Sequence, residues 1–198
     1  MSENISSTPH KVSHGARCSR NGHEGGVIWF TGLSASGKTT LATLLERRLF
    51  LAGYQVFMLD GDNLRCGLCS DLGFSEADRG ENIRRAAELS GLFAEAGVVV
   101  ISSFISPFQR DRSLARELAG APFHEIYLNA SLSTCEERDP KGLYARARAK
   151  KIQEFTGVSS PYEVPDKANL MVNTGGQPID VCLDQIYAYV MQHFPIRG

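Results

Sequence analysis

The residues best suited to chemistry form one run, Gly32-Leu33-Ser34-Ala35-Ser36-Gly37-Lys38-Thr39. Their spacing matches the phosphate-binding loop G-x-x-x-x-G-K-[ST]. In such a loop the backbone N–H groups cradle anionic oxygens, the lysine reaches the β- and γ-phosphates, and the threonine hydroxyl ligates Mg²⁺. The apolar run Val27–Phe30 precedes the loop and a helical pattern follows it. We therefore predict a nucleoside triphosphate site over this run and Thr40, with Lys38 and Thr39 in these two roles.

A second polar group, Asp60-Gly61-Asp62-Asn63, follows the strand predicted over Gln55–Leu59. Carboxyl ends of parallel strands share one edge of a sheet, so these carboxylates should face the phosphate loop. Either could bind Mg²⁺ or accept a proton from an attacking hydroxyl. Switch GTPases and many ATPases instead carry an aspartate after the strand beside the loop strand. The predicted strand Val98–Ser102 ends in serines, which favours a small-molecule kinase.

Alternating strands and helices must position these residues. We predict strands over 27–31, 55–59, 98–102, 123–129 and 168–173, with the third, most β-prone strand at the centre. Helices are predicted over 37–53, 76–96, 107–118, 131–138 and 179–194, with Ser75 as an N-cap and Pro107 in a first turn. The pattern predicts the P-loop NTPase fold, a five-stranded parallel sheet flanked by helices. The basic segment 139–166 is predicted to be a lid over the phosphates.

Length and composition narrow the class of protein. The 198 residues suit one domain, and the net charge of -1 argues against nucleic-acid and membrane-surface partners. There is no run of about 18 apolar residues and no apolar signal core, so we expect a cytoplasmic protein. The five irregularly spaced cysteines, including Cys66 and Cys69, are expected to be reduced thiols. Residues 1–24 lack apolar periodicity and are predicted to be a flexible arm before a P-loop domain over 25–198.

The sequence resembles the adenylylsulfate kinase (APS kinase) family in six ordered segments. They are FTGLSASGKTT from Phe30, DGDNLR from Asp60, DLGFSEADRGENIRR from Asp71, FISPF from Phe104, CEERDPKGLYARARA from Cys135 and FTGVSSPYEVP from Phe155. The resemblance implies transfer of the ATP γ-phosphate, with Mg²⁺, to the 3′-hydroxyl of adenosine 5′-phosphosulfate, the second activating step of sulfate assimilation. It also implies a homodimer. The sequence departs from the family at Cys66, where histidine is common, and at Lys150-Lys151, where Gly-Glu is commoner.

The resemblance further implies which residues hold the acceptor nucleotide. The matching positions are Asp62, Asn63, Arg65, Phe74, Arg79, Asn82, Ile105, Ser106, Lys141 and Phe155. Arginines and an amide suit a phosphosulfate, and two phenylalanines suit stacking on adenine. The catalytic candidates are Lys38, Asp60, Asp62 and Ser106, and the metal candidates are Thr39 and Asp60. Ser106 matches a serine proposed in the family to be phosphorylated. We assign it mainly to acceptor binding, because direct in-line transfer needs no covalent intermediate.

Two other functions stay open at this point. The chain could be another P-loop kinase of a small metabolite, such as a sugar acid or a nucleoside monophosphate. It could also be a regulatory module that binds nucleotide without turnover. Phe74 and Phe155, together with DGDNLR, argue against the first alternative. Four intact residues argue against the second alternative: Lys38, Thr39, Asp60 and Asp62.

Overall fold

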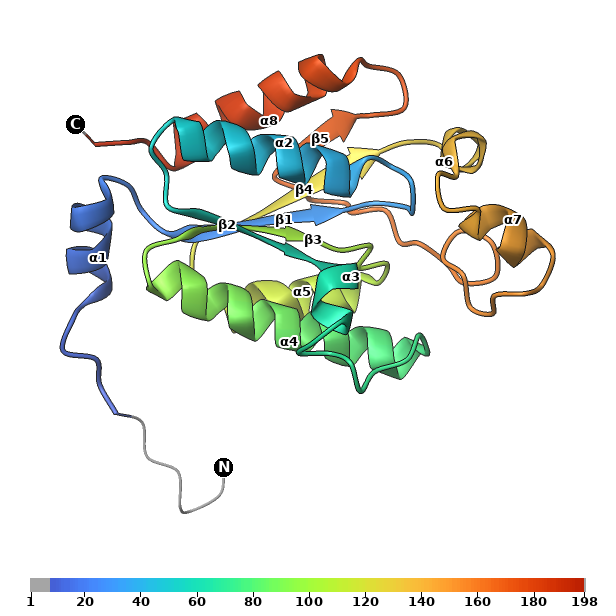
Figure 1. The fold of residues 1–198 in the computed structure, drawn as a ribbon, viewed down its shortest axis with the longest axis horizontal. Coiled ribbons are helices and arrows are strands. Elements are labelled where there is room, and N and C mark those ends of the chain that lie inside the picture. Colours follow the sequence, from blue (N-terminus) through green and yellow to red (C-terminus); the bar gives the residue numbers. More distant parts are fainter. Residues whose placement is uncertain (1–7, 198) are drawn as a thin grey trace.

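The computed structural model describes residues 8–197 as a five-stranded parallel sheet with helices on both faces (Figure 1). The strands are β1 (Gly26–Thr31), β2 (Val56–Asp60), β3 (Val99–Ser103), β4 (Phe123–Asn129) and β5 (Leu170–Asn173). The helices are α1 (His14–Asn21), α2 (Lys38–Leu51), α3 (Gly61–Arg65), α4 (Glu76–Glu95), α5 (Gln109–Ala119), α6 (Leu132–Arg138), α7 (Leu143–Arg148) and α8 (Ile179–His193). The predicted P-loop type of α/β fold is confirmed.

The strand that leads into the phosphate loop, β1, lies at the centre of the sheet, whose order is β2-β3-β1-β4-β5. The prediction that the strand near Val98–Ser102 would be central is wrong, because that strand, β3, lies between β2 and β1. Every residue of both β1 and β3 is buried. An apolar composition reports burial on both faces, which these two strands share. Composition therefore could not decide between them.

Side chains of β1 alternate between two apolar cores, one on each face of the sheet. Ile28 and Phe30 pack with α2 and α8, whereas Val27 and Trp29 pack with α4 and α5. Figure 1 shows α2 and α8 on one face of the sheet, and α4 and α5 on the other. The loop that follows β1 therefore starts from a strand fixed on both sides.

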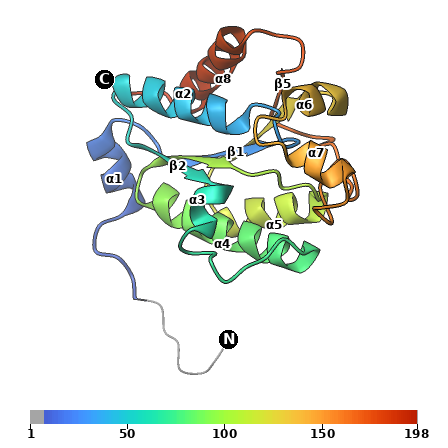
Figure 2. The ribbon, with the colours of Figure 1, turned by 45° about the vertical axis from the view of Figure 1, so that its right-hand side comes forward.

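All strand pairs are parallel, so the carboxyl ends of the strands meet at one edge of the sheet. This edge carries Thr31 of β1, Asp60 of β2 and Ser103 of β3. Figure 1 and Figure 2 show α6 and α7 beyond this edge, with α1 near the opposite one. The phosphate loop, the acidic turn and the basic segment 139–166 thus gather at one side. Among the described helices, none has both the length and the apolar composition needed to cross a membrane.

Part of the predicted arm over 1–24 is folded. Residues His14–Asn21 form α1, which a serine side chain caps at its N-terminus. Cys18 is the one buried residue of this helix. A single buried side chain gives no apolar periodicity, so the sequence pattern could not reveal the helix. Residues 1–7 of the predicted arm lie outside the described residues.

Two helix starts show where local rules succeed and fail. Ser75 caps α4 as predicted, because its Oγ accepts a hydrogen bond from the N–H of Asp78 at 3.2 Å. The sequence predicts Pro107 in the first turn of α5, but this helix begins at Gln109. The N–H of Gln109 donates instead to the carboxylate of Glu163 at 2.6 Å. That partner is remote in the chain, so no local rule could include it.

His124 on β4 should make the fold sensitive to acid. Burial, with the charges of His193 and Arg116, lowers the pKa of His124 from 6.5 to about 4. Between these pH values the unfolded chain binds a proton that the folded protein excludes. The contribution of His124 to the free energy of unfolding is therefore fully present above pH 6.5 and is lost as the pH falls toward 4. We expect His124→Gln to flatten this part of the curve of unfolding free energy against pH, measured by urea denaturation. The exposed-site control His10→Gln should keep the slope, and equal slopes in both variants would contradict the prediction.

Candidate active site

The phosphate loop turns tightly at two glycines. Gly32 has φ of 152°, and a Cβ there would come within 2.8 Å of the carbonyl oxygen of Leu128. Gly37 has φ of 97° and precedes the first turn of α2. The N–H groups of that turn point back toward the loop and favour a bound anion. The loop therefore has the shape and the donors that a phosphate group needs.

Lys38 lies inside the loop and is 8% exposed. Its Nζ donates to the carbonyl oxygens of Gly32 at 2.9 Å and of Leu33 at 2.6 Å. Burial lowers the pKa of this amine to about 8, while Cys135, Asp60 and Asp62 act in the opposite direction. An anionic ligand beside the amine would favour its charged form.

The first hydroxyl of α2 contacts the acid that ends β2. Thr39 Oγ1 donates to Asp60 Oδ2 at 3.0 Å, and Asp60 Oδ1 accepts from the N–H of Asp62 at 3.0 Å. The structure thus brings Asp60, and not Asp62, against the threonine of the loop. A hydroxyl and a carboxylate are the oxygen ligands that Mg²⁺ prefers. No group of three or more His, Cys, Asp or Glu residues within 8–197 could hold a metal alone, so a bound Mg²⁺ would share its ligands with phosphate oxygens and water.

Asp62 faces the basic segment instead. Its Oδ2 lies 2.5 Å from the Nζ of Lys141, and hydrogen bonding with Asp62 raises the pKa of this lysine. Both side chains are mostly exposed, so the pair contributes little to stability. Its value is positional, because it joins α3 to the loop between α6 and α7. Asn63 is exposed beside it on α3.

Arg65 and Arg79 surround Phe74, whose side chain is 65% exposed. The guanidinium carbon of Arg65 lies 4.5 Å from the centre of the Phe74 ring. Arg79 donates through Nε to the carbonyl oxygen of Phe74 at 2.8 Å and through Nη1 to Thr156 Oγ1 at 2.8 Å. It also contacts the carbonyl oxygen of Glu154. Two cations beside an exposed aromatic ring suit an anionic nucleotide.

The segment 139–166 has a small apolar core that packs on the phosphate loop. The rings of Phe155 and Tyr144 meet edge to face, with centres 5.0 Å apart. Leu33 and Ala35 of the phosphate loop pack against this core. The Tyr144 hydroxyl donates to the carbonyl oxygen of Ser34 at 3.0 Å. The predicted lid is therefore in contact with the phosphate loop. Among the described residues the ring of Phe155 pairs with Tyr144, and no ring pair joins it to Phe74.

The loop after β3 is held by buried groups. Ser106 is 2% exposed and has φ of 39°, and its Oγ accepts from Trp29 Nε1 at 3.1 Å. The carbonyl oxygen of Ile105 accepts from Thr31 Oγ1 at 2.8 Å. Asn82 on α4 is also buried, and its amide nitrogen has no hydrogen-bond partner in the described part of the chain. A buried donor of this kind requires an explanation, and a bound ligand would supply one.

Sequence reasoning missed three residues that organise the site. Trp29 and Thr31 lie in β1 and look like ordinary strand residues, although each donates a hydrogen bond to the loop after β3. The one signal was a polar Thr31 at the end of an apolar run. Tyr144 lies in the segment that was predicted only as a helix-plus-loop lid, and its contact with Ser34 depends on the detailed fold of that lid.

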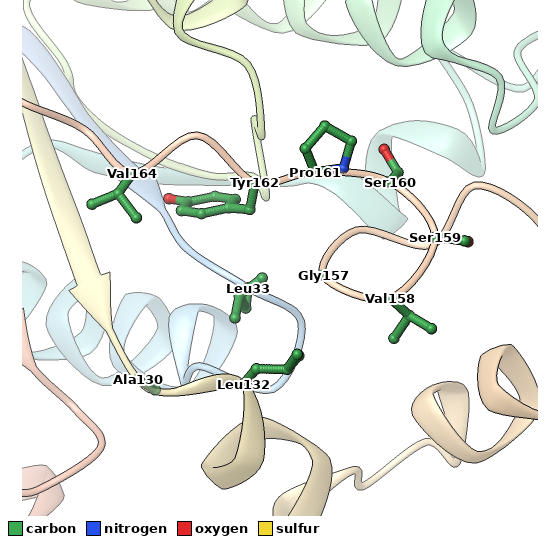
Figure 3. Close-up of a pocket in the computed structure, with 10 residues that line it drawn as sticks. All are labelled: Leu33, Ala130, Leu132, Gly157, Val158, Ser159, Ser160, Pro161, Tyr162 and Val164. Carbon is green, nitrogen blue, oxygen red and sulfur yellow. The ribbon is translucent and has the colours of Figure 1, made fainter.

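A cavity of about 650 Å³ opens beside the phosphate loop. Its lining comes from Leu33, from Ala130 and Leu132 before and in α6, and from the segment 157–164. Figure 3 shows Leu33 and Leu132 on one side and the turn at Gly157 on the other. Of the residues that the sequence assigns to substrates, Leu33 alone lines this cavity. The cationic surface around Phe74 is therefore a separate part of the site.

The fold and the site together define a P-loop kinase. The phosphate loop has the geometry of a phosphate cradle, and the oxygens of Thr39 and Asp60 lie together at its end. The cationic surface at Arg65, Phe74 and Arg79 has the chemistry that an anionic substrate needs.

Comparison with known proteins identifies the family. The model of the adenylylsulphate kinase family matches residues 24–173. An adenylyl-sulfate kinase of Marinobacter nauticus is 50% identical over 190 residues, which are 96% of each chain. The APS kinase of Mycobacterium tuberculosis, solved in complex with AMPPNP and APS, has a TM-score of 0.81 at 45% identity and covers 84% of this chain and 98% of its own. A hexameric APS kinase from Thiobacillus denitrificans has a TM-score of 0.66 at 30% identity. The match covers 87% of this chain and 30% of that one. The chain belongs to the adenylylsulphate kinase family.

Proposed function

We propose that this enzyme transfers the γ-phosphate of ATP to the 3′-hydroxyl of adenosine 5′-phosphosulfate, which gives ADP and 3′-phosphoadenosine 5′-phosphosulfate. The observation that carries the proposal is the cationic and aromatic surface formed by Arg65, Phe74 and Arg79 at the sheet edge that also holds the phosphate loop. One nucleotide needs the loop and the other needs this surface. The product is an activated form of sulfate, so the reaction belongs to sulfate assimilation.

On the donor side, residues 32–40 bind the ATP phosphates in this proposal. The loop N–H groups and the N-terminus of α2 hold the phosphate oxygens. Lys38 stabilises the negative charge that develops on the transferred phosphoryl group. Thr39 and Asp60 would hold Mg²⁺, because their oxygens lie 3.0 Å apart at the end of the loop. When bound, the metal ion supplies charge neutralisation at the phosphates.

On the acceptor side, the adenine would stack between Phe74 and Phe155, and Arg65, Arg79 and Asn82 would hold the phosphosulfate. The remaining contacts fall to Asp62, Asn63, Ile105, Ser106 and Lys141. The amide nitrogen of Asn82, which has no partner within residues 8–197, and the exposed ring of Phe74 support these roles. The lid over 139–166 carries Lys141 and Phe155, so its position sets the acceptor geometry.

The chemical step is direct in-line transfer. Asp60 is the first candidate to accept the proton of the 3′-hydroxyl, with Asp62 as the second. Ser106 is assigned to acceptor binding, since its buried hydroxyl already accepts a hydrogen bond from Trp29 and a covalent intermediate is unnecessary.

Three further properties belong to the same proposal. The catalytic unit extends over residues 25–198, the enzyme works in the cytoplasm, and two copies form a homodimer. The dimer rests on the family resemblance. Light scattering of the purified full chain measures it directly, with a mass near twice 21.7 kDa as the expected result.

The test of the activity is ADP release with and without adenosine 5′-phosphosulfate. Release should depend on the sulfated nucleotide and should be accompanied by the 3′-phosphorylated product. Equal rates with shikimate, gluconate or a nucleoside monophosphate would favour another metabolite kinase. ATP binding without any acceptor-dependent release would favour a regulatory module.

Phe74→Ala should raise the KM for adenosine 5′-phosphosulfate by about 5- to 20-fold, because the variant loses one stacking surface for the adenine. The KM for ATP should change by less than about 2-fold, since the phosphate loop is untouched. Steady-state kinetics with each substrate varied in turn measures both values. Phe50→Ala is the control, because Phe50 is equally exposed but lies on α2. Similar increases in both KM values would exclude the stacking role.

A further inference from the structure

Arg112 of α5 is a buried cation that connects separate parts of the site. The residue is 1% exposed. Its Nη1 donates to the carbonyl oxygen of Ser106 at 2.8 Å, and its Nη2 donates to the carbonyl oxygen of Glu163 at 2.8 Å. Its Nε lies 2.9 Å from a carboxylate oxygen of Glu125 on β4, which is 4% exposed. A buried ion pair is weak evidence for a stabilising role, because desolvation offsets the attraction. The two carbonyl contacts therefore need another explanation.

A second chain of contacts joins the same parts through Thr31, the last residue of β1. The Thr31 hydroxyl donates to the carbonyl oxygen of Ile105 at 2.8 Å. A hydroxyl has one proton, so the 2.9 Å contact between Thr31 and Tyr162 must be a hydrogen bond donated by the tyrosine. Burial raises the pKa of Tyr162, which keeps its proton in place. The chain of donors thus runs from the lid through β1 to the loop after β3.

Glu163 attaches the end of the lid to the last part of that loop and to the start of α5. Its N–H donates to the carbonyl oxygen of Pro107 at 2.8 Å, and its carboxylate accepts from the N–H of Gln109 at 2.6 Å. Ser106, directly before these contacts in the chain, has φ of 39°, a conformation that persists only where the surroundings hold it. Arg112 contacts the carbonyl oxygens of Ser106 and Glu163 at once, so it links the loop after β3 to the end of the lid.

We propose that Arg112, with its counter-ion Glu125 and with Tyr162, is a positioning junction that fixes Ile105 and Ser106 and the end of the lid relative to the phosphate loop. The inference rests on the proposed function, in which these two residues and the lid contact the acceptor. The three junction residues act through backbone atoms and through Thr31, and they are not themselves catalytic residues. Their loss should therefore disturb acceptor binding and leave the donor loop, which β1 and α2 hold, intact.

The sharpest variant is Tyr162→Phe, which removes one hydroxyl and keeps the ring beside Tyr127, whose centre is 6.1 Å away. We expect the KM for adenosine 5′-phosphosulfate to rise about 3- to 10-fold, as for the loss of one net hydrogen bond, with less than about a 2-fold change in the KM for ATP. Arg112→Lys keeps a charge beside Glu125 but lacks the fork that reaches both carbonyls. Arg112→Lys should raise the ratio of the KM for adenosine 5′-phosphosulfate to the KM for ATP further than Tyr162→Phe does. Tyr127→Phe is the matched control, because its hydroxyl bonds Asn129 at 3.2 Å and not the loop.

Thermal unfolding of each variant separates positioning from general destabilisation. A lowered unfolding temperature with an unchanged ratio of the two KM values would overturn the proposal, as would equal rises in both. The wild-type enzyme in the same assay tests the proposed function independently. Wild-type ADP release that ignores the sulfated nucleotide would refute the function. Normal wild-type turnover with an unchanged KM ratio in Tyr162→Phe and Arg112→Lys would refute the junction alone.

Discussion

Lys38→Ala is expected to lower kcat about 10²- to 10³-fold, the effect of removing one preorganised donor from a reacting group. The KM for ATP should change by less than about 5-fold. The reason lies in the contacts of the amine, which already donates to the carbonyl oxygens of Gly32 and Leu33. Nucleotide binding exchanges these hydrogen bonds for others, so little binding energy is gained in the ground state. The amine contributes when charge develops on the transferred group.

Initial rates of ADP release at saturating substrate concentrations measure this effect. Lys167→Ala is the control, because Lys167 is an exposed lysine before β5 and away from the loop. A wild-type kcat in Lys38→Ala would exclude the assigned role. A raised KM for ATP with unchanged kcat would show that the lysine serves ground-state binding.

Asp60→Asn is expected to lower kcat about 10²-fold or more and to raise the concentration of Mg²⁺ needed for half-maximal rate. The substitution removes the charge beside Thr39 but keeps an oxygen that can accept the N–H of Asp62, so α3 retains its N-cap. The fold should therefore survive while the metal ligand and candidate base are lost. Rates measured over a series of free Mg²⁺ concentrations give both numbers.

The matched variant is Asp62→Asn, which removes a carboxylate two residues away. Asp62 is exposed and pairs with Lys141 of the lid, so we expect a smaller loss, about 10-fold or less, and an unchanged Mg²⁺ requirement. The opposite ranking of the two variants would transfer the metal and base roles to Asp62. The pair of variants thus decides between the two carboxylates that the sequence left open.

The placement of the phosphate loop beside Asp60 could be predicted from the sequence because its geometry is local. The phosphate loop is a run of consecutive residues, and Asp60 ends the next strand along the chain. Parallel strands bring their carboxyl ends to one edge whatever their order. This is why Thr39 and Asp60 lie in contact even though the strand predicted to be central was the wrong one.

The acceptor half depends on contacts between distant segments, and local patterns do not encode them. Arg112 stands in the polar run DRSLAR and looks like an exposed helical charge, yet it is buried against Glu125. The start of α5 is likewise set by Glu163, which lies far along the chain. The family resemblance named candidate acceptor residues, and the structure added the partners that hold them. Their assignment to the acceptor stays a prediction.

The backbone of Ser106 also governs which substitutions this position can tolerate. At φ of 39° the residue occupies the left-handed region, which glycine and asparagine adopt readily and β-branched residues resist. Threonine keeps the hydroxyl but adds a branch at Cβ, so an inactive Ser106→Thr enzyme would report on backbone shape rather than on chemistry. Glycine removes the hydroxyl and relaxes the backbone at once. The activities of a series of variants at this position therefore depend first on whether each residue can adopt the left-handed backbone conformation, and only then on the chemistry of its side chain.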